Sequence, residues 1–425
     1  MEKTKSPSST TRAIVFIIIG LLIGSGIGYV AAVSTRASSS SSSKLVTYTI
    51  GLASDLSGGG ESFGTETVTS AQIAVTQING YLAAAGSNVR FALSSPTDTL
   101  TTTDGAVSAI TTLASAGDDI ILCHCWSGQL SAVESYANTN KLVVVSVSST
   151  SNLLAVPKGY LFRMIAPDSF QGKALTTLLW GDGIKNVAVI YRNDAYGQGI
   201  SGVFQTEFTA LGGKVTLEAY DPTLSDFASE VATLASNVQT LGVGKQTAVL
   251  FIGFATEAVN IFGHATSYNA LTGVRWFSSE GPKGSTILPP TVPASIGQFE
   301  VQTNITGTFP QSITNNSIAT AYIALFKAQT GNYPQSYGEQ AYDSVYLLAN
   351  SILAVGSENS TAVKNILPTM ASHMYGASGP LLLDSNGDKA SQDYAIWTIV
   401  NNQGTYSFKN IGGWAAATGE IIYNQ

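Results

Sequence analysis

The stretch 118–149, "DDIILCHCWSGQLSAVESYANTNKLVVVSVSS", decides the fold class. Two short runs rich in Ile, Leu and Val flank a segment with the length and polarity of a surface helix. A strand, a helix and a second strand in that order predict one crossover unit of a parallel sheet. Because both strands are almost wholly apolar, we expect helices to cover both faces of this sheet.

The same alternation fills the chain from residue 46 and restarts near residue 159. We therefore expect the α/β class, with two doubly wound parallel-sheet lobes joined by a hinge. Lobe 1 is predicted over 46–166 and 300–378, and lobe 2 over 167–299 and 379–425. The last segment reads as hairpin-like, with turn signals at 385–387 and 402–404.

The N-terminus has a composition of its own. Residues 1–12 are basic, residues 13–33 are apolar and carry no charge, and residues 34–45 are rich in serine. An uncharged run of this length can span a bilayer, and basic residues before it place the N-terminus in the cytoplasm. The run fits a retained membrane anchor or a cleaved signal peptide, and its length favours the anchor. We expect the body to lie on the extracytoplasmic side of the cell membrane, behind a flexible Ser-rich linker.

The charge of the body excludes some partners. After residue 44 the chain has 26 acidic and 15 basic side chains, so it is poorly suited to bind nucleic acid. The whole chain has three histidines, too few for a multi-histidine metal site. We expect no cofactor and no metal.

The two cysteines are Cys123 and Cys125, with His124 between them. Two thiols are too few for a structural metal site, and no other cysteine exists. A buried strand end is the favoured interpretation, and a local disulfide outside the cell is the alternative.

Small polar groups and aromatic rings follow the ends of successive predicted strands, where an open α/β sheet binds its ligands. Hydroxyls near a helix N-terminus suit a carboxylate, while an acid beside rings suits an ammonium and an apolar side chain. The pattern therefore predicts a site for a small zwitterion. Its residues are Phe63, Trp126, Ser127, Ser148, Ser149 and Thr150 in the first half and Tyr196, Phe254 and Glu280 in the second.

With these pieces in order, the chain resembles type I solute-binding proteins of ABC importers, in the leucine/isoleucine/valine-binding family. The resemblance runs from about residue 46 to the C-terminus. It is carried by segments such as "LSGGGESFG", "WSGQLSAVESYA", "FRMIAPDSFQG", "VAVIYRNDAYGQG" and "GFATEAVNIFGHA". It implies an extracytoplasmic protein that captures a small amino acid, branched-chain or otherwise apolar, or a related amide. The ligand would lie in a cleft between the lobes and be presented to permease subunits.

The resemblance also implies a role for each residue of the site. Ser127 matches a serine that bonds the ligand carboxylate, Ser148 a position that uses its backbone groups, and Thr150 a threonine that bonds both ligand termini. Glu280 matches the acid that pairs with the ammonium. The positions of Phe63, Tyr196 and Phe254 match aromatic residues. Phe254 replaces a tyrosine, and Trp126 replaces a smaller residue, so both alter the pocket expected for branched-chain ligands.

Two alternatives stay open beside this non-enzymatic reading. A sensor ectodomain of the same fold would have a receptor chain as its partner. A serine hydrolase is suggested by Gly60-Glu61-Ser62-Phe63-Gly64, which has the G-x-S-x-G spacing. In that reading Ser62 is the nucleophile, with His264 or His373 as a distant partner. However, Asp55 to Gly60 separate this serine from the preceding strand, whereas the motif requires a turn directly after it.

Overall fold

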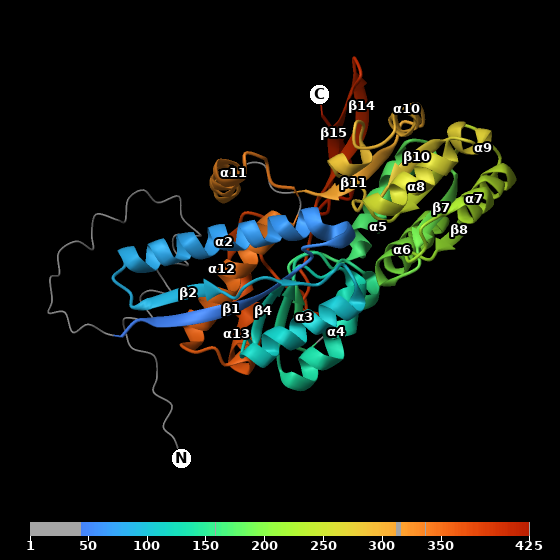
Figure 1. Cartoon of the computed structure of the whole chain (residues 1–425). Helices are drawn as coiled ribbons and strands as arrows, with labels where there is room; N and C mark the ends of the chain where they lie inside the picture. Colours follow the sequence, from blue (N-terminus) through green and yellow to red (C-terminus); the bar gives the residue numbers. More distant parts are fainter. Residues whose placement is uncertain (1–43, 158, 312–315, 336, 425) are drawn as a thin grey trace. The chain divides into compact units, whose positions relative to one another are not determined.

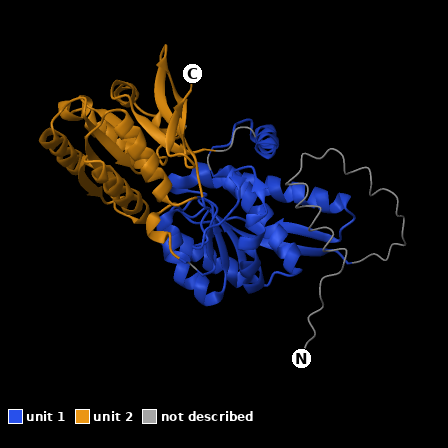
Figure 2. Cartoon of the chain, turned by 180° about the vertical axis from the view of Figure 1, so that it is seen from behind, with its two compact units in different colours: residues 1–149, 157–165, 312–390 blue, residues 150–156, 166–311, 391–425 orange. Residues whose placement is uncertain are grey.

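A computed structural model of the protein describes residues 44–157, 159–311, 316–335 and 337–424. The chain divides into two compact units (Figure 2). Unit 1 is built from segments 1–149, 157–165 and 312–390, and unit 2 from 150–156, 166–311 and 391–425. The expected lobe boundaries therefore differ at 150–156, 166 and 300–311, which belong to unit 2, and at 379–390, which belongs to unit 1.

Unit 1 contains a parallel sheet with the strand order β2-β1-β4-β5-β6, and β3 also pairs with β1. Helices α3 and α4 cover one face, and α2, α12 and α13 cover the other (Figure 1). The strands are β1 Val46–Ser54, β2 Val89–Leu93, β3 Thr97–Asp98, β4 Ile120–Cys123, β5 Val143–Ser146 and β6 Leu161–Arg163, and β12 Tyr375–Gly376 pairs separately with β13 Gly379–Pro380. The helices are α2 Glu61–Ala84, α3 Thr103–Ala116, α4 Ser127–Asn140, α11 Ser317–Thr330, α12 Gly338–Val355 and α13 Ser360–Ser372. The doubly wound arrangement expected from 118–149 is thus confirmed, with β4, α4 and β5 as its crossover unit.

Unit 2 contains a mixed sheet with the strand order β16-β15-β14-β11-β10-β9-β7-β8. The strands β7 to β11 are parallel, and the last three are antiparallel. The strands are β7 Asn186–Arg192, β8 Lys214–Tyr220, β9 Thr247–Ile252, β10 Arg275–Ser278, β11 Thr306–Pro310, β14 Tyr394–Asn402, β15 Thr405–Ala415 and β16 Glu420–Tyr423. The helices are α5 Asp168–Gly181, α6 Ala195–Ala210, α7 Ala228–Leu241, α8 Ala255–Ala265, α9 Asn269–Thr272 and α10 Ala294–Gln302.

The hairpin predicted near 402–404 joins β14 to β15. Asn402 pairs with Thr405, and the two loop residues Gln403 and Gly404 both have positive φ, at 53° and 92°. That geometry matches the twist of the flanking strands. The other turn signal, at 385–387, lies in unit 1, where Gly387 donates from its N–H to the carbonyl of Asp384.

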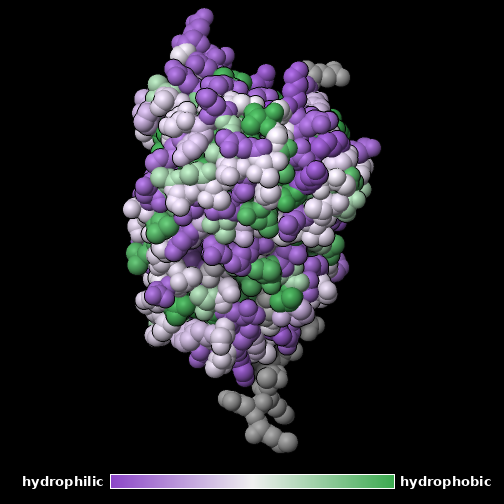
Figure 3. Space-filling model, turned by 90° about the vertical axis from the view of Figure 1, so that its right-hand side faces the viewer, coloured by the Kyte–Doolittle hydropathy of each residue, from purple (hydrophilic) through white to green (hydrophobic). Residues whose placement is uncertain are grey.

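The predicted membrane span, 13–33, lies outside the described residues. Among the residues that the structure does describe, no helix is both long and apolar enough to cross a membrane. On the face drawn in Figure 3, apolar residues are scattered among polar ones and form no broad patch.

Glu300 in α10 is a fully buried carboxyl of unit 2, next to an apolar cluster that includes Trp276 and Phe299. Neither carboxyl oxygen has a hydrogen-bond partner among the described residues. Burial raises the pKa of Glu300 to about 8. The unfolded chain ionises this carboxyl near its ordinary pKa, so the folded form holds one extra proton between that pKa and about 8. Folding stability is therefore lost as the pH rises through this window.

We expect Glu300→Gln to remove that loss. Relative to the unsubstituted protein, the variant should gain stability as the pH rises from 5 to 7.5. The gain should approach the limit of about 1.4 kcal/mol per pH unit that one proton allows. Urea unfolding of both proteins at the two pH values measures it. Glu420→Gln, on exposed strand β16 of the same unit, is the control and should leave the pH dependence unchanged. An equally flat result for Glu300→Gln would contradict the assigned protonation.

Candidate functional site

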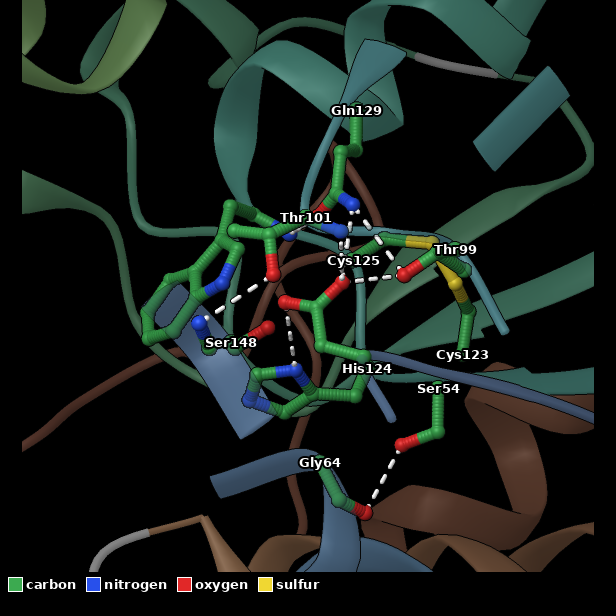
Figure 4. Close-up of polar contacts among 12 residues, drawn as sticks. Ser54, Gly64, Thr99, Thr101, Cys123, His124, Cys125, Gln129 and Ser148 are labelled. Atoms are coloured by element: carbon green, nitrogen blue, oxygen red, sulfur yellow. Dashed lines mark hydrogen bonds and ion pairs between the residues drawn. A yellow bond between two sulfur atoms is a disulfide. The ribbon is translucent and has the colours of Figure 1, made fainter. Parts of the chain in front are cut away.

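The glycine-rich opening segment forms a tight corner between β1 and α2. A 3-10 turn at Gly58–Gly60 follows the strand, and α2 begins at Glu61. A Cβ atom on Gly64 would lie 1.8 Å from the carbonyl oxygen of Asp55, so only glycine fits at this close approach. Ser54 donates from its hydroxyl to the carbonyl of Gly64 at 2.8 Å (Figure 4). Phe63 lies in the first turn of this helix.

Ser62 is exposed in the same first turn of α2, and its hydroxyl has no hydrogen bond to another described residue. The two histidines considered as its partners are engaged elsewhere. Nε2 of His264 lies 2.5 Å from a carboxylate oxygen of Asp226, and Nδ1 of His373 lies 2.8 Å from the carbonyl of Thr369. The structure thus gives the hydrolase reading no nucleophile–base pair.

Cys123 and Cys125 form a disulfide at the end of β4, and both are fully buried. The favoured expectation of a buried strand end is confirmed, and the local disulfide that was the alternative is present as well. The peptide around the bridge is held on both sides. The N–H of His124 donates to the carbonyl of Ala53 at 3.0 Å, and the hydroxyl of Ser146 donates to the carbonyl of Cys125 at 2.9 Å.

Four rings of unit 1 gather at this corner. Phe63 and Trp126 meet edge to face with centroids 5.7 Å apart, and Tyr337 lies 5.7 Å from each of them. The ring of His124 stacks parallel to Phe63 at 6.4 Å and meets Trp126 at 4.8 Å. We call Phe63, His124, Trp126 and Tyr337 the ring cluster. Sequence reasoning missed Tyr337 because it lies more than 200 residues away, and His124 because it was considered only with the cysteines.

Predicted hydroxyl residues lie beside this cluster in unit 1. Ser127 is the first residue of α4, and its Oγ lies 3.4 Å from that of Ser149. Ser146 Oγ accepts from the N–H groups of Ser148 and Ser149 at 3.4 and 3.1 Å, which fixes the turn after β5. Ser148 is 1% exposed, and its own hydroxyl has no partner among the described residues. A helix N-terminus with buried hydroxyls is suited to bind an anion.

Unit 2 brings together the other half of the predicted residues. Tyr196 and Phe254 stack with centroids 5.4 Å apart, and the Tyr196 hydroxyl lies 2.8 Å from Oε2 of Glu280. Arg192 lies over the ring of Phe254 at 4.1 Å and pairs with Glu257 at 2.5 Å. Glu280 is 1% exposed. Glu280 and the rings of Tyr196 and Phe254 thus lie together in unit 2.

Thr150 also belongs to unit 2, and its carbonyl accepts from the N–H of Asp168 at 2.7 Å. The Thr150 hydroxyl is buried without a partner among the described residues. Burial and the negative charges of Asp168 and Glu280 raise the pKa of Tyr394 well above its usual value, so both carboxylates lie near this phenol. The sequence analysis missed Asp168 and Tyr394. Asp168 lies inside the quoted segment "FRMIAPDSFQG", directly before a helix, which was the available signal.

No group of three or more His, Cys, Asp or Glu side chains within the described ranges is placed to hold a metal ion.

Residues 47–405 match the family model described as periplasmic binding protein. The chain belongs to the periplasmic binding protein family.

Relatives of this periplasmic binding protein extend over most of its length. An uncharacterized protein of Methanocaldococcus jannaschii is 26% identical over 88% of this chain and 90% of its own. The solved branched-chain amino acid transporter substrate-binding protein LivJ of Streptococcus pneumoniae, in complex with isoleucine, is 22% identical. It covers 90% of this chain and 100% of its own, with a TM-score of 0.66. A solute-binding protein of an ABC transporter from R. palustris, in complex with benzoate, is 18% identical. It covers 85% and 95% of the two chains, with a TM-score of 0.67. These likenesses show the fold of type I solute-binding proteins.

Proposed function

We propose that this protein captures a small amino acid or a related amide outside the cytoplasm and presents it to permease subunits of an ABC importer. Family membership supports the solute-binding role. The proposed ligand class rests on two features of the predicted site. These are the buried hydroxyls of Ser148 and Thr150 and the buried carboxylate of Glu280. In this proposal residues 13–33 tether the protein to the membrane.

The carboxylate of the ligand is assigned to the hydroxyl side. Ser127 opens α4, where free N–H groups and the helix dipole favour negative charge. The hydroxyls of Ser148 and Thr150 are buried and lack partners among the described residues, so a ligand oxygen would satisfy them. Isoleucine and benzoate, held by the two structural relatives, are both carboxylates, which agrees with this assignment.

The ammonium of the ligand is assigned to Glu280. This acid is buried and hydrogen-bonded to Tyr196, so its direction is fixed before binding. Phe254 and Tyr196 offer ring faces beside it, which suit both a cation and an apolar group. A simple carboxylate without an ammonium would bring no positive charge to the Glu280 carboxylate. Amino acids therefore fit this side better than benzoate-like acids.

A thermal-shift screen of the full-length protein tests the proposal. The compounds are the common amino acids, their amides and benzoate, each at millimolar concentration. A ligand that binds only the folded protein should raise Tm by several degrees at a concentration far above its Kd. The shift should disappear in Thr150→Val, which removes one buried hydroxyl at constant size, and persist in Thr206→Val on the exposed face of α6. A screen in which no compound raises Tm would refute the proposed ligand class.

A further inference from the structure

His124 occupies a special position in unit 1. Side chains alternate along an extended chain, so the disulfide between its two neighbours lies on one side and the imidazole on the other. The ring is fully buried and lies among Phe63, Trp126 and Tyr337, with centroids 6.4, 4.8 and 6.1 Å away. The two cysteines cannot turn independently, so the bridge fixes the direction of this side chain.

Asp55 orients the imidazole from the end of β1. Its Oδ2 lies 3.4 Å from Nδ1 of His124. Its Oδ1 accepts from Nε2 of Gln129 at 2.9 Å, from the N–H of Thr101 at 3.2 Å and from the hydroxyl of Thr99 (Figure 4). Burial acts to raise the pKa of Asp55, but the hydrogen bonds and charge of His124, with Gln129 and Thr99, lower it below the ordinary value. The carboxylate is therefore ionised and held in place.

The other ring nitrogen, Nε2 of His124, is buried and has no hydrogen-bond partner among the described residues. Buried polar atoms in proteins are nearly always hydrogen-bonded, to protein, water or ligand. An imidazole whose Nδ1 faces a fixed carboxylate has its second nitrogen available for exactly one further partner.

We propose that His124, held by Asp55, binds an acidic group on the side chain of the ligand through Nε2. This inference rests on the proposed function and narrows its substrate class to amino acids that carry a second carboxylate. An imidazolium donates a charge-assisted hydrogen bond to a carboxylate, and such bonds are stronger than neutral ones. Aliphatic amino acids would leave this buried nitrogen without a partner.

Two ionisable groups and two neutral rings surround the imidazole. Asp55 faces it from the end of β1, and Tyr337 lies beside it at the start of α12. Phe63 and Trp126 contribute the neutral rings. A carboxylate of the ligand at Nε2 would place the imidazole between two acidic groups.

Calorimetry with two matched pairs of probes tests this inference on the full-length protein. The pairs are L-aspartate with L-asparagine and L-glutamate with L-glutamine, which differ in charge at nearly constant shape. Within at least one pair we expect the acid to bind at least tenfold more tightly than its amide, because only the acid brings a second carboxylate to Nε2.

Two variants separate the charge of His124 from its shape. His124→Gln keeps a donor but cannot carry a charge, so it should bind acid and amide equally. His373→Gln, an exposed histidine of the same unit, should behave as the unsubstituted protein. If His124→Gln does not fold, NMR of the three histidine rings in the unsubstituted protein answers the same question. L-glutamate or L-aspartate should then shift the ring resonances of the buried histidine more than L-glutamine or L-asparagine does.

The outcomes distinguish the two proposals. Equal affinity for acid and amide in the unsubstituted protein overturns the role of His124 and leaves the proposed function standing. Tight binding of leucine or isoleucine, without binding of L-aspartate or L-glutamate, also overturns the role of His124 and leaves the proposed function standing. If none of the amino acids binds, the proposed function fails first and this inference fails with it.

Discussion

Glu280→Gln is expected to weaken amino-acid binding by roughly a hundredfold or more, because it removes the negative charge opposite the ligand ammonium. Glu280 is 1% exposed and is held by Tyr196 at 2.8 Å. A buried ammonium that loses its partner keeps its desolvation cost and gains no compensating attraction. Glutamine preserves the size of the side chain, so the loss reports on charge.

Calorimetry with the amino acid found in the screen measures this effect, with the exposed Glu420→Gln of the same unit as control. The corresponding compound without its amino group is a second check. It should bind the unsubstituted protein poorly and lose little more affinity in Glu280→Gln. Unchanged amino-acid affinity would remove Glu280 from the ammonium site.

Asp388→Asn is expected to lower the free energy of unfolding by about 3–5 kcal/mol, since it leaves a buried guanidinium without its counter-charge. Arg163 donates from Nε and Nη2 to the two oxygens of Asp388, both at 2.6 Å, and both side chains are fully buried. The same guanidinium donates from Nη1 to the carbonyl of Ser149 at 3.2 Å. The substitution should therefore also disturb the turn at Ser148 and Ser149 after β5 and weaken ligand binding.

Urea unfolding measures this loss, and Asp182→Asn is its control. Asp182 pairs with Arg275 at 2.8 Å, but the two side chains keep 24% and 31% of their exposure. An ion pair that remains hydrated should contribute less than about 1 kcal/mol. A loss for Asp388→Asn no larger than that of the control would show that the buried pair does not stabilise unit 1 as its geometry implies.

The sequence predicts those elements whose signals lie in neighbouring residues. The apolar runs around β4 and β5 and the loop at Gln403 and Gly404 predict elements that the structure confirms. Those signals depend on side-chain period and turn chemistry, which neighbouring residues determine. The assignment of the predicted site residues to a ligand stays a prediction.

The features that the sequence did not predict depend on contacts between different elements of the fold. The start of α2 at Glu61 depends on the close approach of Gly64 to the backbone of Asp55, and helix propensity gives no sign of this contact. Tyr337 and Asp388 contact residues more than 200 positions earlier, so no local pattern could place them. The segment 300–311 belongs to unit 2 because β11 pairs with β10 and β14, a choice of neighbours that the apolar run at β11 does not specify.

Segments of the two units alternate along the chain, and this order affects how the units can fold during synthesis. The chain passes from one unit to the other at 149/150, 156/157, 165/166, 311/312 and 390/391. Helix α12, which packs against α2 in unit 1, and strand β14, which lies beside β11 in unit 2, are both made after residue 311. A nascent chain therefore cannot complete either core until the ribosome has nearly finished translation. Apolar surface of both incomplete cores stays exposed until then, so chaperones can bind the growing polypeptide.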